Sequence, residues 1–186
     1  MEEIKILTEL IRYEVCGSEI SSDLKANINQ DTLQSVLKLA RKHDLAHLVA
    51  DCVEKEKLLD LSLAIGQALV QEKQLALFRY MQISYEYERV CDLLEREKTP
   101  FIQLKGSILR EYYPQAWMRT SSDIDVLVKK EDIDRLVKIL CEELGYKLSE
   151  IGNHDAQLFS ESGVHLELHY TFDEENVFKK DLLSFN

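Results

Sequence analysis

The stretch that decides the fold runs from Pro100 to Val128 and reads PFIQLKGSILREYYPQAWMRTSSDIDVLV. It begins where a helical pattern ends, because proline has no amide hydrogen and disfavours a helical conformation in the residue before it. It ends in Asp123–Val128, where Asp123 and Asp125 alternate with the apolar residues Ile124 and Val126. An alternation with period two predicts a strand with one buried face and one face that carries Asp123 and Asp125.

Upstream of this stretch the apolar residues recur at helical spacing. We predict helices over residues 2–16, after Asp31 as N-cap, after Asp44, and within residues 60–98. The last would be roughly 55 Å long if unbroken, at 1.5 Å per residue. Either this helix spans two subdomains, or it breaks, near Gly66 or at Leu59-Asp60.

Downstream, the pattern changes between strand and helix several times. We predict strands at 101–104, 123–128, 146–151, 157–160 and 165–170, and helices at 107–113 and 131–144, the latter closed by Gly145. The fold class is therefore α+β, a mixed sheet with flanking helices preceded by an all-helical region. The expected domains are a helical region over 1–98, an α/β domain over 99–176, and the start of a further helix over 177–186. The abrupt end of that helix leaves open that the chain is part of a longer protein.

The composition of the chain argues against several classes of protein. The chain has 186 residues, 45% of them apolar, and 23 basic against 34 acidic residues give a formal charge of −11. This charge disfavours binding to bulk nucleic acid, whose affinity comes mostly from phosphate contacts. The four cysteines are far apart and read as small buried residues in a reducing compartment. With no signal peptide and no long apolar run, we expect a soluble cytoplasmic protein with no membrane contact.

The acidic pair Asp123 and Asp125 is the first candidate for chemistry. Two carboxylates at positions i and i+2 of a strand lie on the same face and can reach one cation, and Mg²⁺ prefers oxygen ligands. A lone Asp-x-Asp is nevertheless short and common. Taken alone, it is more simply explained by a capping Asp123 and an exposed Asp125.

Two other features give the pair more weight. Gly106-Ser107 lies at a strand-to-helix junction, where backbone amides can hold phosphate. Near the end, alternation in residues 165–170 places Glu167 on a polar face as a third carboxylate. Three converging carboxylates can hold two Mg²⁺ ions, and Glu167 can also accept the proton of an attacking hydroxyl.

With these residues in view, the sequence resembles the uncharacterised bacterial nucleotidyltransferase family of the polymerase-beta superfold, whose pattern is a Gly-Ser turn, a strand-borne Asp-x-Asp and a later acidic residue on another strand. The resemblance covers about residues 100–170. It implies Mg²⁺-dependent transfer of a nucleoside monophosphate from a nucleoside triphosphate such as ATP to a hydroxyl, with Mn²⁺ as an alternative ion. The matching segments are Leu104-Lys105-Gly106-Ser107, Tyr113-Pro114, Arg119, Asp123–Val128, Gly145-Tyr146 and Glu167-Leu168-His169.

The resemblance also implies roles for individual residues. Asp123 and Asp125 would bind both metal ions, with Glu167 as the third carboxylate, and Gly106 and Ser107 would hold the triphosphate. The third carboxylate is Glu where much of the superfold has Asp, so its reach differs by one methylene.

Four further side chains are interpreted from their place beside these motifs. We interpret Lys105 and Arg119 as cations that face phosphate, with solvated surface as the equal alternative. His169 is interpreted as a residue that orients Glu167, and His165 as structural.

Two other functions stay open beside the nucleotidyltransferase with its small-molecule or protein acceptor. One is a catalytically degenerate domain that binds nucleotide or regulates a partner. The other is an Asp-x-Asp glycosyltransferase, which would need a Rossmann-like region upstream of the acidic pair. Residues 1–99 read as helical instead, which disfavours the glycosyltransferase.

Overall fold

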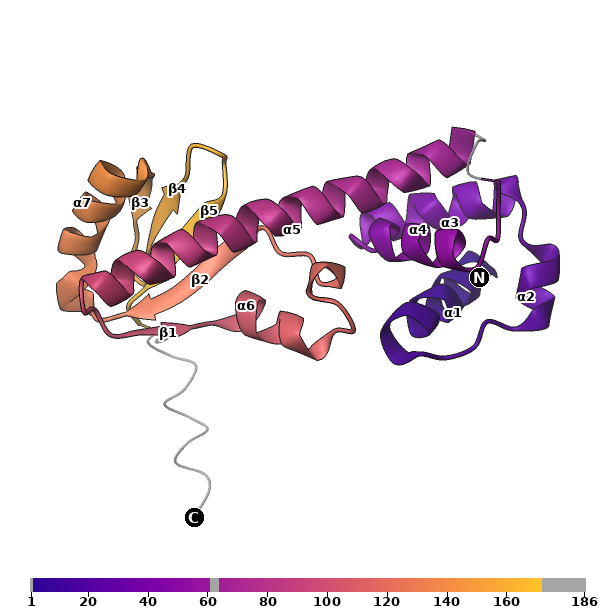
Figure 1. The fold of residues 1–186 in the computed structure, drawn as a ribbon, viewed down its shortest axis with the longest axis horizontal. Helices are drawn as coiled ribbons and strands as arrows, with labels where there is room; N and C mark the ends of the chain where they lie inside the picture. The colour runs from indigo at the N-terminus through magenta and orange to yellow at the C-terminus, as the bar shows by residue number, and fades with distance from the viewer. Residues whose placement is uncertain (1, 61–63, 172–186) are drawn as a thin grey trace, which may run out of the picture. The chain divides into compact units, whose positions relative to one another are not determined.

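The structure is a computed structural model that describes residues 2–60 and 64–171 (Figure 1). The predicted helix start at 177–186 lies outside the described residues. The chain divides into two compact units, one formed by residues 1–80 with 110–120 and the other by residues 81–109 with 121–186. Each unit is described by itself below.

The first unit is helical. It contains α1 (Glu2–Cys16), α2 (Ser22–Asn27), α3 (Gln30–Lys42), α4 (Ala46–Lys55) and the first part of α5 (Ala64–Arg96). Helices α1, α3 and α4 pack against one another, and their apolar faces bury a common core. The prediction of a helical first half is confirmed. The most deeply buried side chains of this core include Leu10, Leu33, Val36, Ala40, Val49, Cys52, Val53 and Leu69.

The helix starts differ from the prediction in two places. Helix α3 has Asn29 as its N-cap rather than Asp31, because the Asn29 side chain accepts a hydrogen bond from the Thr32 amide at 3.0 Å. Asp31 lies in the first turn, where a negative charge favours the helix dipole. Helix α2 was not predicted, since it is only six residues long and buries a single apolar side chain, Leu24.

Helix α5 continues unbroken for 33 residues, about 50 Å at 1.5 Å per residue. Gly66 lies inside it without interrupting it, so the break expected at Gly66 does not occur. The preceding helix ends at Lys55, and residues 56–60, which include the expected break at Leu59-Asp60, are not helical.

The segment 110–120 packs against the helices of this first unit. Trp117 and Met118 are buried there together with Leu48. The His47 Nε2 lies 2.9 Å from the Met118 carbonyl oxygen, and the Thr120 hydroxyl donates to Asp44 at 2.6 Å. The connection between α6 and β2 is therefore anchored to the helical unit at several points.

The second unit is a five-stranded mixed sheet in the order β1-β2-β5-β4-β3. Strands β2 and β5 are parallel, and the other neighbours are antiparallel. The second part of α5 and helix α7 (Ile133–Leu144) bury their apolar residues against one face of this sheet. The α+β fold class with a helical N-terminal region is confirmed. The strands are β1 (Phe101–Gln103), β2 (Asp123–Val128), β3 (Lys147–Ile151), β4 (Asp155–Phe159) and β5 (His165–His169).

Several element ends in this unit differ from the prediction. Helix α6 (Lys105–Leu109) begins before the expected residue 107, and its continuation Arg110–Tyr112 is a 3-10 turn. Strand β4 begins at Asp155 rather than at residue 157. Helix α7 ends as predicted at Gly145, which has a φ of +73°, a conformation that glycine adopts without strain.

Two sequence-based expectations about the whole chain can be compared with the described residues. None of the described helices combines the length and the apolar composition needed to cross a membrane. All four cysteines are free, but only Cys52 is buried as predicted, whereas Cys91 and Cys141 are half-buried and Cys16 is exposed.

Candidate functional site

The face of the sheet that points away from α5 and α7 carries polar side chains in register. Ile124, Val126, Leu166 and Leu168 are buried in the core, so their neighbours in sequence point to the opposite face. Across the parallel pair β2–β5, Asp123 lies opposite His165 and Asp125 opposite Glu167. The pairing register therefore brings the two motifs together, although about forty residues separate them in the sequence.

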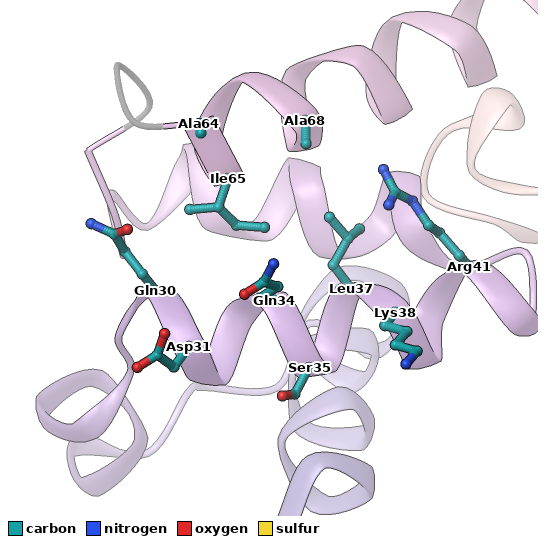
Figure 2. A pocket seen from close by; sticks show the side chains of 10 residues that line it. All are labelled: Gln30, Asp31, Gln34, Ser35, Leu37, Lys38, Arg41, Ala64, Ile65 and Ala68. Atoms are coloured by element: carbon teal, nitrogen blue, oxygen red, sulfur yellow. The ribbon is translucent and has the colours of Figure 1, made fainter.

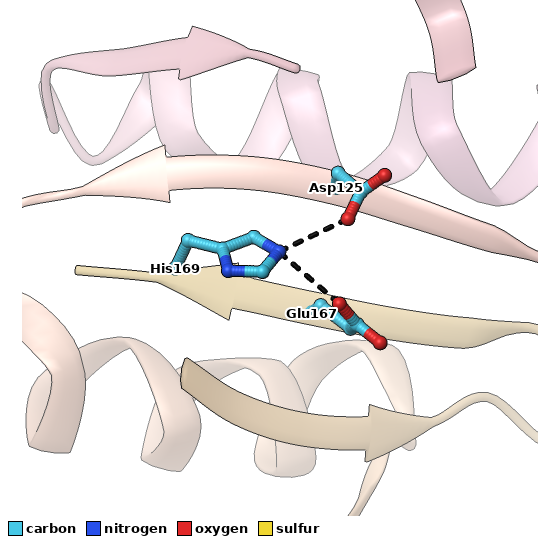
Figure 3. Close-up of side chains that lie close together, drawn as sticks. All are labelled: Asp125, Glu167 and His169. Carbon is cyan, nitrogen blue, oxygen red and sulfur yellow. Dashed lines mark hydrogen bonds and ion pairs between the residues drawn. The ribbon is translucent and has the colours of Figure 1, made fainter. Parts of the chain in front are cut away.

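Three of these side chains converge in one cluster (Figure 3). The His169 Nε2 lies 3.0 Å from the Asp125 Oδ1 and 3.1 Å from the Glu167 Oε2. One ligand atom from each of the three residues lies within 4.8 Å of the others. His169 therefore contacts both carboxylates, whereas the sequence predicted that it would orient only Glu167.

Asp125 is the most deeply buried member of the cluster. It is 5% exposed, whereas Glu167 and His169 are half-buried. A buried carboxylate needs a cation or hydrogen-bond donors nearby. Here the Lys105 Nζ lies 3.5 Å from the Asp125 Oδ1, the oxygen that also faces His169. The site therefore places two nitrogen groups around one buried oxygen.

Lys105 has an unusual backbone conformation. Its backbone φ is +26°, a value that residues other than glycine rarely adopt. The preceding residue, Leu104, donates its amide hydrogen to the Asp125 carbonyl oxygen at 3.1 Å. This bond holds the turn after β1 beside β2, so that the Lys105 side chain reaches the acidic cluster.

The other residues predicted for the site lie on β2, in α6 and in the segment 110–120. Asp123 is half-buried on the same face of β2, opposite His165, and does not belong to the group of converging ligand atoms. Gly106 is buried and Ser107 follows it within α6. Arg119 lies in the segment 110–120, which belongs to the helical unit.

His165 has more contacts than a purely structural interpretation predicts. Its Nδ1 lies 3.6 Å from the Glu167 Oε1. Its ring stacks on Phe159 with the ring centres 4.6 Å apart and the planes 14° apart. The His165 Nε2 is buried and has no hydrogen-bond partner among the described residues. His165 therefore links the acidic cluster to an aromatic side chain on β4.

The residues that sequence reasoning missed are Gln157 and Phe159 on β4. Gln157 lies opposite Glu167, and Phe159 lies opposite His165. The sequence pattern that could have identified them is their alternation with Ala156 and Leu158, which are fully buried. That alternation places Gln157 and Phe159 on the polar face, but only the strand order shows that β4 is the neighbour of β5.

A buried polar network holds the turn that leads into β5. The Glu86 carboxylate of α5 accepts hydrogen bonds from the Tyr146 hydroxyl at 3.2 Å and from the Ser162 hydroxyl at 3.1 Å, and it pairs with Arg89 at 3.0 Å. Burial, reinforced by the Glu86 charge, raises the pKa of Tyr146. The turn between β4 and β5 is thereby fixed to α5, which holds the start of β5 in place.

A pocket of about 600 Å³ lies elsewhere, between α3 and the beginning of α5 (Figure 2). Its walls combine polar, charged and aliphatic side chains with a single carboxylate, Asp31, and one of its two cations, Arg41, already binds Glu72 at 2.7 Å. The pocket lacks the combination of carboxylates and histidine found on the sheet. The acidic cluster on β2 and β5 is therefore the stronger candidate for chemistry.

The cluster fits a divalent metal ion. Two carboxylate oxygens and one imidazole nitrogen are a donor set that such ions use, and ligands of one ion typically lie about 3–4 Å apart when each is roughly 2.0–2.2 Å from it. The two distances around the His169 Nε2 fall in this range. Nitrogen among the donors suits Mn²⁺ at least as well as Mg²⁺, which prefers oxygen alone.

Comparison with known proteins agrees with this chemistry. A comparison with curated proteins found no match. The model of the uncharacterised nucleotidyltransferase family matches residues 29–184, a range that contains the acidic cluster, the turn at Gly106 and most of the helical unit. Because this match covers most of the chain, the protein belongs to the uncharacterised nucleotidyltransferase family.

Proposed function

We propose that this protein is a metal-dependent nucleotidyltransferase that transfers a nucleoside monophosphate from a nucleoside triphosphate to a hydroxyl of a small molecule or protein. Family membership supports nucleotidyl transfer in general, with a nucleoside triphosphate as substrate and a divalent metal as the usual cofactor. The polymerase-beta superfold, a bacterial origin and ATP as donor are parts of the proposal. The division into a helical region over 1–98 and a nucleotidyltransferase-like domain over 99–176 is also part of the proposal.

The observation that carries this proposal is the convergence of Asp125 and Glu167. They lie on adjacent parallel strands, in register, and both contact the His169 Nε2. Two carboxylates placed so closely repel each other unless a positive charge lies between them. A metal ion bound there would supply that charge and would stabilise the negative charge of a triphosphate during transfer.

The residues of the site have distinct proposed roles. Asp125 and Glu167 would hold the metal, with His169 as a third ligand, and Asp123 would be a further carboxylate ligand. Glu167 would also accept the proton of the acceptor hydroxyl, because its carboxylate is more exposed than that of Asp125. His169 thus has a more direct role than the orientation of Glu167.

The phosphate groups are proposed to lie on the β1 side of the cluster. Lys105 provides a cation there, and the backbone of Gly106 and Ser107 lines the same turn. Arg119 remains a proposed phosphate-facing residue from the neighbouring segment. Pyrophosphate would leave from this side of the sheet.

A degenerate module that binds nucleotide without turnover is the second candidate. The observation that favours it is the position of Asp123 outside the group of converging ligand atoms. A glycosyltransferase is disfavoured, because the described residues before β1 form helices and contain no Rossmann-like region.

The proposed function is tested by incubating the full-length protein with each of four labelled nucleoside triphosphates and either Mg²⁺ or Mn²⁺. We expect one triphosphate to release pyrophosphate in a reaction that stops when the metal is chelated. Self-labelling of the protein would identify a protein hydroxyl as acceptor. Metal-dependent binding of nucleotide without any pyrophosphate release would favour the degenerate module instead.

A further inference from the structure

The polar face of the sheet continues beyond Glu167 onto β4. There Gln157 lies beside Glu167 and Phe159 beside His165. Phe159 is 40% exposed, and its ring is held parallel to the His165 ring. A single exposed apolar side chain is common on protein surfaces. This one differs because its partner His165 lies 3.6 Å from the proposed proton acceptor, Glu167.

The direction of transfer indicates what this region contacts. In phosphoryl transfer the attacking oxygen and the leaving oxygen are roughly in line with phosphorus. Lys105, the cation for the leaving phosphates, contacts Asp125 on the β1 side. The strand order places β4 on the other side of β5. If the leaving phosphates lie on the β1 side, an attacking oxygen in line with them comes from the β4 side.

We propose that Phe159, Gln157 and His165 bind the acceptor, and that the acceptor carries its reacting hydroxyl on a ring. This inference rests on the proposed nucleotidyl transfer. Phe159 offers a flat apolar face, against which an aromatic or sugar ring buries apolar surface. Gln157 and Asp155, joined by a hydrogen bond of 3.1 Å, offer polar groups for the other hydroxyls of such a ring.

The bond formed, the bond broken and the proton released in this transfer are all accounted for by the groups named above. The acceptor oxygen forms a bond to the α-phosphorus, and the bond from that phosphorus to the pyrophosphate oxygen breaks. The hydroxyl proton passes to Glu167, and pyrophosphate leaves past Lys105. Phe159 and Gln157 take no part in bond formation and only bind the acceptor.

The test uses three hydroxyl compounds as probes on the full-length protein with Mg²⁺ and a non-hydrolysable ATP analogue. D-glucose carries its hydroxyls on a sugar ring, N-acetyltyrosinamide carries one on an aromatic ring, and glycerol is the acyclic control. Binding is followed through the ring signals of isotope-labelled phenylalanine and histidine in NMR spectra. Nucleotide binding is followed separately through the phosphorus signals of the analogue.

We expect at least one ring probe to shift the signals of Phe159 and His165, while glycerol does not. Which ring probe binds distinguishes a sugar from a phenol. Phe159→Ala should weaken binding of that probe about five-fold or more, in line with losses measured for ring stacking. Phe159→Tyr keeps the flat ring and should retain binding. Phe78→Ala, which removes an exposed phenylalanine from α5, is the matched control and should change nothing.

Three results would overturn the acceptor assignment. The first is that neither ring probe binds, and the second is that glycerol binds as well as the ring probes. The third is that Phe159→Ala weakens binding of the ATP analogue instead of binding of the ring probe. The last result would assign Phe159 to the nucleobase and would leave nucleotidyl transfer intact. Failure of the analogue to bind the wild-type protein with Mg²⁺ would instead count against the proposed function itself.

Discussion

Replacing Asp125 with Asn should lower the rate of metal-dependent pyrophosphate release by about 1,000-fold, equivalent to roughly 4 kcal/mol of transition-state stabilisation. The change removes the negative charge of the most buried carboxylate in the cluster, at the oxygen that faces both His169 and Lys105. The rate is measured for both proteins at the triphosphate and metal concentrations that saturate the wild-type protein. Calorimetry of the same variant should show that metal-dependent binding of triphosphate is lost.

Two other variants make this prediction specific. Asp134→Asn removes the same charge from an exposed position on α7 and should leave the rate within about two-fold of wild type. Asp123→Asn should have a smaller effect than Asp125→Asn, since Asp123 lies outside the converging ligand atoms. Equal triphosphate binding by wild type and Asp125→Asn would contradict the assignment of Asp125.

The second large effect concerns two buried carboxyl groups in the helical unit. The Lys55 Nζ lies 2.8 Å from Glu14 and 2.6 Å from Asp51, and the Lys73 Nζ lies 2.7 Å from Asp51. Burial raises the pKa of Glu14, and Lys55 only partly offsets this. Burial acts in the same direction on Asp51, but hydrogen bonds from the two lysines outweigh it and lower the pKa of Asp51.

The two carboxyl groups should therefore respond differently to removal of their charge. At pH 7, Asp51→Asn should lower the free energy of unfolding by about 2–3 kcal/mol. The loss falls short of the full cost of a broken buried pair, because both lysines can still reach solvent. Glu14→Gln should change stability by less than about 1 kcal/mol, because Gln resembles the neutral acid that burial favours.

The pH dependence follows from the same pKa directions. Asp51 has a lowered pKa in the folded state, so its contribution to stability is present above its unfolded pKa and is lost as the pH falls. Glu14 has a raised pKa, so its contribution is present at acidic pH and is lost as the pH rises. The stability of Glu14→Gln relative to wild type should therefore increase between about pH 4 and pH 7.

The lone tryptophan makes this measurement specific to the helical unit. Trp117 is buried there with Leu48 and Ala76, so its fluorescence during urea unfolding reports on that unit. Glu72→Gln is the control, since the pair between Glu72 and Arg41 lies at the surface and should contribute at most about 1 kcal/mol. A loss of stability in Glu14→Gln as large as that in Asp51→Asn would contradict the opposite pKa shifts.

The sequence predicts local structure well where the apolar pattern is strong. Strand β2 and the end of α7 lie where alternation and Gly145 place them. Short elements with few apolar residues escape this reasoning, as α2 does with Leu24 alone. The cap at Asn29 was missed because Asn29 and Asp31 are both good N-cap residues, and only the hydrogen bond to Thr32 distinguishes them.

The candidate site was predictable in its residues but not in its geometry. Alternation shows that Asp125, Glu167 and His169 each lie on a polar face of a strand. It cannot show that β2 and β5 are parallel neighbours, because strand pairing depends on packing between distant segments. For the same reason His169 was expected to contact one carboxylate and contacts two.

The most direct test of metal-dependent chemistry at this cluster is a crystal of the full-length protein grown with Mn²⁺ and a non-hydrolysable triphosphate analogue. Anomalous scattering locates Mn²⁺ independently of the protein atoms. The proposed function predicts a manganese peak bound by Asp125 and Glu167, with the triphosphate beside Lys105. A bound analogue with no manganese between these two carboxylates would contradict it.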